Sequence, residues 1–447
     1  MKKQLGCTLI LTASLIALNL GTAHAEGETA TAPKALEPFA FGDFSWLNGN
    51  SRQTEFQLDG NIFSGQFTLD ANYVYDFAKP KDHTLTGSTN SGRAQELQVT
   101  QLGVGGDFHY QNVRGRLMTQ FGLYSTMTPR NDASPTRGQW NLADAYRYIS
   151  EASGGYHWDV LNGVNLDVGI FMSYVGLESY YSYENWNYQM SYVSANTPWF
   201  FNGMRLQVFP SDKVKIEAWL VNGWQAYGQF NEAPGFGWQV LWRPTTDWSF
   251  VTNEYLGHDT FNNNDRLRLH SDSSAQYRYY ENQTKGLSKA AASLTVDVGC
   301  ESGGGVSCLK SSNGNPIQNF IGIMAYNRFW FDHDHYGLTL GGGAISNPGR
   351  YLVLYPPING ATAATTGNYF TANPGDPFRA WDASATFDYM PSQFITFRLE
   401  YIHRQTNTPY FAGHNGITPD GGNQGAPGSL VPGFTPDLNK EIGRAHV

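Results

Sequence analysis

Charged side chains of both signs gather in one polar stretch of the chain, residues 127–149. They are Arg130, Asp132, Arg137, Asp144 and Arg147, with Trp140 among them. Side chains of this kind set ion preference when their segment narrows a water-filled passage. The spacing of Leu142, Tyr146 and Ile149 places their apolar side chains on one face of a short helical turn, which we expect to pack against the wall of the surrounding fold. We interpret the stretch either as a constriction or as an ordinary solvated loop.

A second set of charged residues is identified because its members alternate with apolar residues along the sequence. After Lys213, for example, Val214 and Ile216 point one way, while Lys215 and Glu217 point the other. We expect this inward-facing set to line the lumen: Asp70, Asp76, Arg114, Arg116, Lys213, Lys215, Glu217, Asp297, Asp382, Asp388, Arg398 and Glu400. They either contact solutes or form structural ion-pair ladders. Because both signs are mixed, ion selectivity stays open.

Other chemistry is sparse. The chain contains no G-x-S-x-G, no H-E-x-x-H and no phosphate-binding loop. We interpret His333-Asp334-His335 as part of a tight turn, and we expect no enzyme, cofactor or metal. Cys300 and Cys308 flank a glycine-rich loop without histidine, so a disulfide is favoured over a metal site in an oxidising compartment.

The elements that must position these residues are β-strands. From residue 67 to residue 77 apolar and polar side chains alternate, with Val74 the exception, and the pattern recurs at 381–389 and 395–401. A two-residue period over such lengths means a strand with two chemically different faces.

The N-terminus directs the chain out of the cytoplasm. Lys2 and Lys3 precede an apolar run that ends at Ala23-His24-Ala25, which indicates a signal peptide over residues 1–25. No later apolar run reaches 18 residues, so the sequence offers no membrane-spanning helix. A mean hydropathy of −0.41 with 15% aromatic residues suits a barrel with a lipid-facing exterior, a wet interior and aromatic girdles. The net charge of −9 argues against a nucleic-acid partner.

Connections alternate between tight turns and long polar stretches, as in a transmembrane barrel. The long stretches occupy roughly 78–94, 127–149, 177–198, 225–234, 258–274, 299–317, 346–378 and 405–438. We predict an all-β fold, a transmembrane antiparallel up-and-down barrel over residues 62–440, after a periplasmic or inward-folded segment at 26–61. Its complete form would have sixteen strands, of which about fifteen are present.

The last residues of the sequence explain why an odd number of strands is expected. Residues 441–447 lack alternation and match the translation of a common sequencing adapter. We expect them to be an artefact that replaces the last strand, and we expect the natural sequence to continue beyond Lys440 with one more alternating strand.

Several segments resemble the putative β-barrel porin-2 (OmpL-like) family. They are residues 44–52 (FSWLNGNSR), 101–108 (QLGVGGDF), 116–122 (RLMTQFG), 140–146 (WNLADAY), 222–224 (NGW) and 436–438 (PDL). The resemblance implies an outer-membrane porin and carries over no binding residue.

The function predicted from these observations is a channel for passive diffusion of small hydrophilic solutes across the bacterial outer membrane. A surface adhesin or structural barrel and a substrate-specific uptake channel are the alternatives. The expected partners are outer-membrane lipids, the barrel-assembly machinery, periplasmic chaperones and small solutes. A homo-oligomer is left open.

Overall fold

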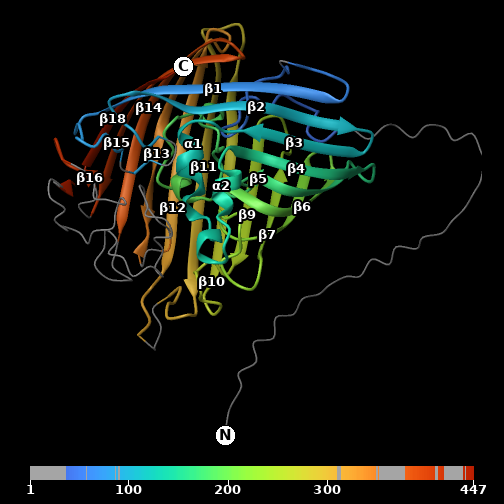
Figure 1. The fold of residues 1–447 in the computed structure, drawn as a ribbon. Coiled ribbons are helices and arrows are strands. Elements are labelled where there is room, and N and C mark those ends of the chain that lie inside the picture. Colours follow the sequence, from blue (N-terminus) through green and yellow to red (C-terminus); the bar gives the residue numbers. More distant parts are fainter. Residues whose placement is uncertain are drawn as a thin grey trace, which may run out of the picture. The chain divides into compact units, whose positions relative to one another are not determined.

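The computed structural model of the protein describes residues 37–56, 58–85, 87–88, 91–309, 314–348, 351, 378–407, 411–416, 436–437 and 439–446. Within them, sixteen antiparallel strands form one closed barrel (Figure 1). Fifteen of these follow one another around the wall: β1 (Phe63–Asp76), β2 (Leu97–Tyr110), β3 (Val113–Thr119), β4 (Ile149–Trp158), β5 (Val164–Met172), β6 (Phe200–Ser211), β7 (Val214–Val221), β8 (Gly235–Trp242), β9 (Trp248–Gly257), β10 (Leu267–Glu281), β11 (Leu287–Ser302), β12 (Asn319–Phe331), β13 (Tyr336–Ser346), β14 (Arg379–Ser392) and β15 (Ile395–Thr406). The predicted all-β barrel is confirmed.

The sixteenth strand corrects the prediction of fifteen. Strand β18 (Asn439–His446) pairs antiparallel with β1 on one side and with β15 on the other, so it closes the barrel (Figure 1). The predicted number of strands was too low because this segment lacks side-chain alternation. The hydrogen bonds between strands join backbone groups and do not depend on that pattern. An unpaired edge at bilayer depth is also costly, which favours closure. The remaining strands, β16 (Phe411–Ala412) and β17 (Pro436–Asp437), form a separate two-stranded sheet.

The two faces of the wall differ as the alternation predicts. Along β14, buried and exposed side chains alternate without a break from Arg379 to Met390, with Asp382 and Asp388 buried and Trp381 and Phe387 exposed. A one-residue slip would invert every side chain, so the register is strongly specified. None of the helices in the described part of the chain is long and apolar enough to span a membrane.

The hydrophobic core lies inside the barrel. Phe44, Trp46 and Leu47 of the N-terminal segment are buried in one cluster with Trp219 of β7 and Trp330 of β12, among others. The Trp46 indole donates a hydrogen bond to the Thr246 carbonyl (3.1 Å). The interior of the barrel is therefore packed around the N-terminal segment.

Short helices occur only in connections of the described chain. They are α1 (Leu123–Met127), η1 (Thr128–Asn131), η2 (Ser134–Thr136), α2 (Leu142–Tyr146), η3 (Ser182–Glu184) and η4 (Ser194–Asn196). The predicted turn around Leu142 and Tyr146 is α2, and the Asn141 side chain caps it by accepting a hydrogen bond from the Ala143 amide.

A substitution at the exposed face tests this architecture. Leu294, near the middle of β11, is 47% exposed. Leu294→Arg should lower the free energy of unfolding in lipid bilayers by ~2–4 kcal/mol, the cost of a cation on the lipid face at the midplane. Urea unfolding in liposomes measures this change. The matched variant Leu294→Ile should unfold like the wild type, and equal stability of all three proteins would contradict the assignment of this face to lipid.

Candidate functional site in the barrel lumen

One connection passes through the interior of the barrel. Residues 173–199, here called the crossing segment, join β5 to β6, and every residue from 185 to 199 is buried. Although it leaves and re-enters the wall at neighbouring strands, its hydrogen bonds reach β1, β2, β4, β8, β9, β12, β14 and β15. A segment bonded to strands around the whole wall must cross the lumen.

Two buried carboxylates hold backbone amides of the crossing segment. Glu400 of β15 accepts hydrogen bonds from the amides of Tyr188 (2.7 Å) and Gln189 (2.9 Å). Asp382 of β14 accepts from the Tyr192 amide (2.8 Å) and the Ser191 hydroxyl (2.9 Å). Hydrogen bonds to a carboxylate are about twice as strong as neutral ones, so these contacts fix the segment's path.

Arginines hold the segment's carbonyl groups. Arg398 donates to the Asn185 carbonyl (2.8 Å), and Arg328 donates to the Trp186 carbonyl (3.1 Å). Both guanidinium groups also pair with Asp388, at 2.6 and 2.7 Å. A third arginine, Arg404, donates to the Met190 carbonyl (2.6 Å). Buried charges are tolerated where each is paired and hydrogen-bonded, and here the crossing segment supplies part of that pairing.

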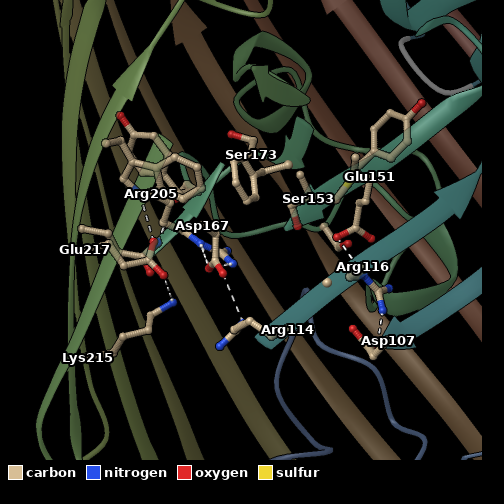
Figure 2. A pocket seen from close by; sticks show the side chains of 18 of the residues that line it. Asp107, Arg114, Arg116, Glu151, Ser153, Asp167, Ser173, Arg205, Lys215 and Glu217 are labelled. Carbon is tan, nitrogen blue, oxygen red and sulfur yellow. Dashed lines mark hydrogen bonds and ion pairs between the residues drawn. The ribbon is translucent and has the colours of Figure 1, made fainter. Parts of the chain in front are cut away.

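A polar cavity of about 710 Å³ lies beside the crossing segment. It reaches from the tight turn at Gln111 and Asn112 to Ser173–Glu184 of the crossing segment, and its wall is formed largely by β3 to β7. Figure 2 shows charged side chains from these strands pointing toward one another around it.

Ion pairs connect the charges of the cavity wall. Asp167 of β5 lies between Arg114 of β3 (Nε to Oδ1, 3.2 Å) and Arg205 of β6 (Nη2 to Oδ2, 2.9 Å). On β3, two residues further along, Arg116 pairs with Asp107 (2.8 Å) and Glu151 (2.9 Å). Lys215 pairs with Glu217 of the same strand at 2.8 Å (Figure 2).

The charged set predicted within 127–149 does not line this cavity. Asp132 accepts hydrogen bonds from the Tyr227 and Gly228 amides (3.0 and 3.1 Å) of another connection, and Asp144 pairs with Arg147 at 2.7 Å. Arg137 is exposed, and the Arg130 side chain lies outside the described part of the structure. The helix α2 packs on Ile170 and Phe200. Ile170 lies two residues after the exposed Val168 on β5, so its side chain is on the same, outward face of the strand. The crossing segment, and not this stretch, supplies residues to the lining of the cavity.

The predicted lumen set divides into two groups, apart from Lys213, Asp76 and Asp297. Arg114, Arg116, Lys215 and Glu217 line the cavity. Asp70, Asp382, Asp388, Arg398 and Glu400 are buried against the crossing segment. Asp76 and Asp297 are also buried, and Asp297 faces the His270 ring at 2.8 Å. Lys213 is exposed in the turn before β7, where its ammonium donates to the Pro244 carbonyl (3.0 Å).

The sequence did contain a signal for the crossing segment. The stretch 177–198 was assigned only as a long polar connection, yet it carries five tyrosines and a tryptophan against two charged residues, Glu178 and Glu184. Aromatic side chains dominate buried cores, so this composition predicts a buried connection. The pairing partners Asp167, Glu151 and Arg205 were missed because ion pairs across strands depend on register.

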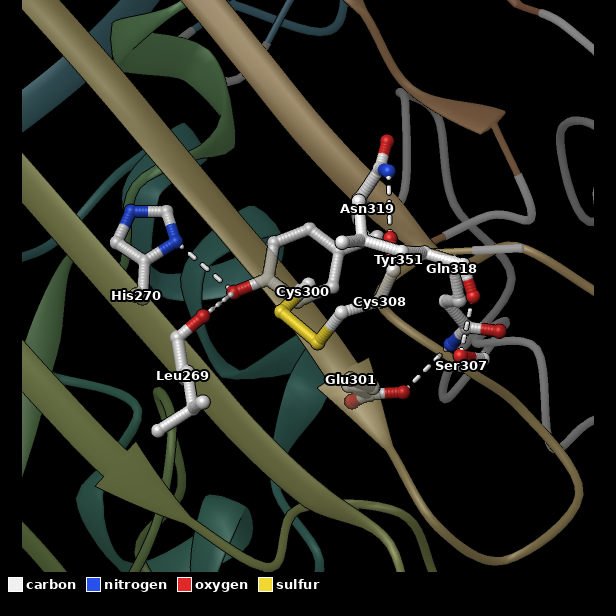
Figure 3. The surroundings of a disulfide bond; sticks show 10 residues. Leu269, His270, Cys300, Glu301, Ser307, Cys308, Gln318, Asn319 and Tyr351 are labelled. Carbon is white, nitrogen blue, oxygen red and sulfur yellow. Dashed lines mark hydrogen bonds between the residues drawn. A yellow bond between two sulfur atoms is a disulfide. The ribbon is translucent and has the colours of Figure 1, made fainter. Parts of the chain in front are cut away.

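The predicted disulfide is present. Cys300 and Cys308 are bonded, and the Cys308 carbonyl accepts a hydrogen bond from the Asn319 side chain (2.9 Å), as Figure 3 shows. Nearby, Tyr351 lies against His270, with its hydroxyl 2.9 Å from Nδ1. Among the described residues no group of His, Cys, Asp or Glu side chains could hold a metal ion.

Comparison with protein families decides the identity. Residues 63–425 match the family described as "Putative beta-barrel porin-2, OmpL-like". The chain belongs to this family. The porin is accordingly an outer-membrane barrel, as its apolar outer face and polar inner face require.

Comparisons with solved structures and with curated sequences add no argument to the family match. The porin is similar to OmpT of Vibrio cholerae (10% identity, 87% of this chain and 98% of that chain covered, TM-score 0.45). It is also similar to the channel DcaP of Acinetobacter baumannii (11%, 88% and 99%, 0.43) and to an anion-selective porin from Comamonas acidovorans (8%, 86% and 99%, 0.47). A comparison with curated proteins gives no match. No residue role transfers at this level of similarity.

Titration of the crossing segment provides a test of its burial. Burial raises the pKa of Glu178 to about 8, although the nearby Ser194 and Asn187 side chains lower it, and the charges of Asp382 and Glu400 add to the rise. Because the pKa is raised on folding, the contribution of Glu178 to stability is complete below its ordinary pKa of 4.5 and is lost as the pH rises through about 8.

We therefore expect the thermal midpoint of the wild-type porin to fall between pH 5 and pH 9 more steeply than that of Glu178→Gln, as measured by circular dichroism. Glu232→Gln, at an exposed position, should retain the wild-type slope. Identical slopes for wild type and Glu178→Gln would show that this carboxyl is not buried in solution.

Proposed function

We propose that the porin forms a water-filled channel through which small hydrophilic solutes diffuse passively, with the crossing segment as its constriction. The observation that carries the proposal is the attachment of residues 173–199 to strands around the whole wall, next to a polar cavity. A fixed segment in the lumen narrows the passage and places its own side chains in the path of solutes.

The size and polarity of the cavity support this reading. Its volume of about 710 Å³ falls within the range of roughly 300–1,000 Å³ that accommodates small molecules. Arg114 and Lys215 offer hydrogen-bond donors on its wall, and solvated charges of this kind suit hydrophilic solutes. Lipids around the apolar outer face and small solutes in the lumen are the partners that we propose.

Conductance of the purified protein in planar lipid bilayers tests the proposal. The wild type should give discrete single-channel steps. A variant in which a short Gly-Ser linker replaces residues 183–192 should give steps several-fold larger, because it removes the part of the segment held by Glu400 and Arg398.

The matched control shortens residues 137–141, which are exposed outside the lumen, and its conductance should equal that of the wild type. Heat-modifiable mobility on a gel verifies that each barrel is folded. A folded wild type without conductance would refute the channel and favour an adhesin or a structural barrel. Larger steps from the 137–141 variant alone would return the constriction to the 127–149 stretch.

A further inference from the structure

Five charged side chains on β3, β5, β6 and β7 form one cluster on the cavity wall, here called the cationic cluster: Arg114, Asp167, Arg205, Lys215 and Glu217. It contains three cations and two carboxylates, which leaves one excess positive charge. Figure 2 shows these side chains directed toward one another at one side of the cavity.

The acceptors of the cluster are already saturated. Asp167 uses Oδ1 for Arg114 and Oδ2 for Arg205. Glu217 accepts from Lys215 (2.8 Å) and Gln207 (2.6 Å) at Oε1, and from the Trp219 indole (2.9 Å) at Oε2. The Asp167 side chain is 3% exposed and the Glu217 side chain is 2% exposed. Both carboxylates therefore neutralise part of the charge of the cations while lying beneath the cavity surface.

Donors, in contrast, remain available toward the cavity. The Arg114 side chain is 38% exposed, and among the described residues only Asp167 pairs with it, through Nε. Its two terminal nitrogens are therefore left for a ligand. Lys215 and Arg205 are each 19% exposed. A surface of spare guanidinium and ammonium N–H groups with its carboxylates consumed is complementary to an oxyanion.

The backbone around the cluster is shaped to hold it. Arg114, Gly155, Asp167 and Arg205 lie side by side in register on β3, β4, β5 and β6. A Cβ at Gly155 would lie 2.2 Å from Asp167 Oδ1 and 2.3 Å from the Leu166 carbonyl oxygen, so only glycine lets Arg114 reach across β4. Arg205 is fixed by the rings of Phe171 and Trp219, at 4.7 and 5.4 Å.

The remaining charges of the cavity lie apart from this cluster. Arg116 is taken up by Asp107 and Glu151, which makes that neighbouring group net negative. Burial raises the pKa of Glu184 to about 7 and that of Glu178 to about 8. Because the group around Arg116 is net negative, the cavity is not uniformly positive, and the excess of cations is local to the cluster around Arg114.

We propose that the cationic cluster is a binding subsite for the oxyanion group of a small solute, a carboxylate, phosphate or sulfate, on its way through the channel. This inference rests on the proposed channel function and names the chemical class of solute that the cavity retains. Arg114 supplies the direct contact, and Asp167 and Glu217 position the cations.

Inorganic phosphate is the probe. The single-channel potassium chloride current of the full-length protein is measured as phosphate is added at constant ionic strength, with the expectation of saturable partial block. Arg114→Gln should raise the half-blocking concentration about tenfold, the effect of losing one strong charge-assisted hydrogen bond. The half-blocking concentration of Arg114→Lys should lie between those of the wild type and Arg114→Gln. Arg114→Gln leaves Asp167 paired with Arg205, so the barrel should still fold.

Arg137→Gln removes the same charge at an exposed site outside the cavity, and phosphate should block its current at the same concentration as that of the wild type. Block that is unsaturable, or equal in wild type and Arg114→Gln, would overturn the subsite while leaving the channel intact. If no variant conducts, the channel proposal fails. Calorimetric titration of the folded barrels with phosphate then decides the subsite alone, and equal heats for wild type and Arg114→Gln would refute it.

Discussion

The interior of this porin depends on buried charges that hold a polypeptide segment across the barrel. Glu400 and Asp382 accept amide hydrogen bonds of the crossing segment, while Arg328, Arg398 and Arg404 donate to its carbonyl groups. A buried charge without a partner is strongly destabilising, whereas a paired one is tolerated. The wall and the segment therefore require each other, and the cavity has its shape because the segment cannot move away from the wall.

The same network separates two uses of charge inside one barrel. Where the crossing segment contacts the wall, acids and arginines are consumed by backbone groups, and Asp388 is shared by two arginines. Where it leaves the wall uncovered, between β3 and β7, charges pair with one another and some cations stay exposed to the cavity. Structural and cavity-facing charges have identical residue types, and only their neighbours distinguish them.

This distinction explains what the sequence could and could not predict. Alternation in β1, β14 and β15 identified the barrel and the inward face of Asp70, Asp382 and Glu400, because strand periodicity is a local property. Which inward charges face the cavity depends on contacts between residues about 200 positions apart, such as Glu400 with Tyr188. The two interpretations of the 127–149 stretch could not be separated for the same reason, because the contacts of Asp132 and Asp144 with other residues depend on the fold.

Strand β18 shows a second limit. Its backbone pairs with β1 and β15 although its sequence lacks alternation, so a side-chain pattern alone undercounted the wall. The requirement that no strand edge stays unpaired in a bilayer is a property of the whole barrel and cannot be read from one segment.

Chemical modification of a single cysteine during channel recording tests the central claim, that residues 173–199 form the constriction. Apart from the bonded pair Cys300–Cys308, the only cysteine is Cys7 in the expected signal peptide, so an introduced thiol is unique in the mature chain. Ser179→Cys lies on the cavity, and a bulky methanethiosulfonate reagent should reduce its current in one step per channel. Modification of Trp140→Cys, at an exposed position outside the cavity, should leave the current unchanged, and the opposite pattern would contradict the account.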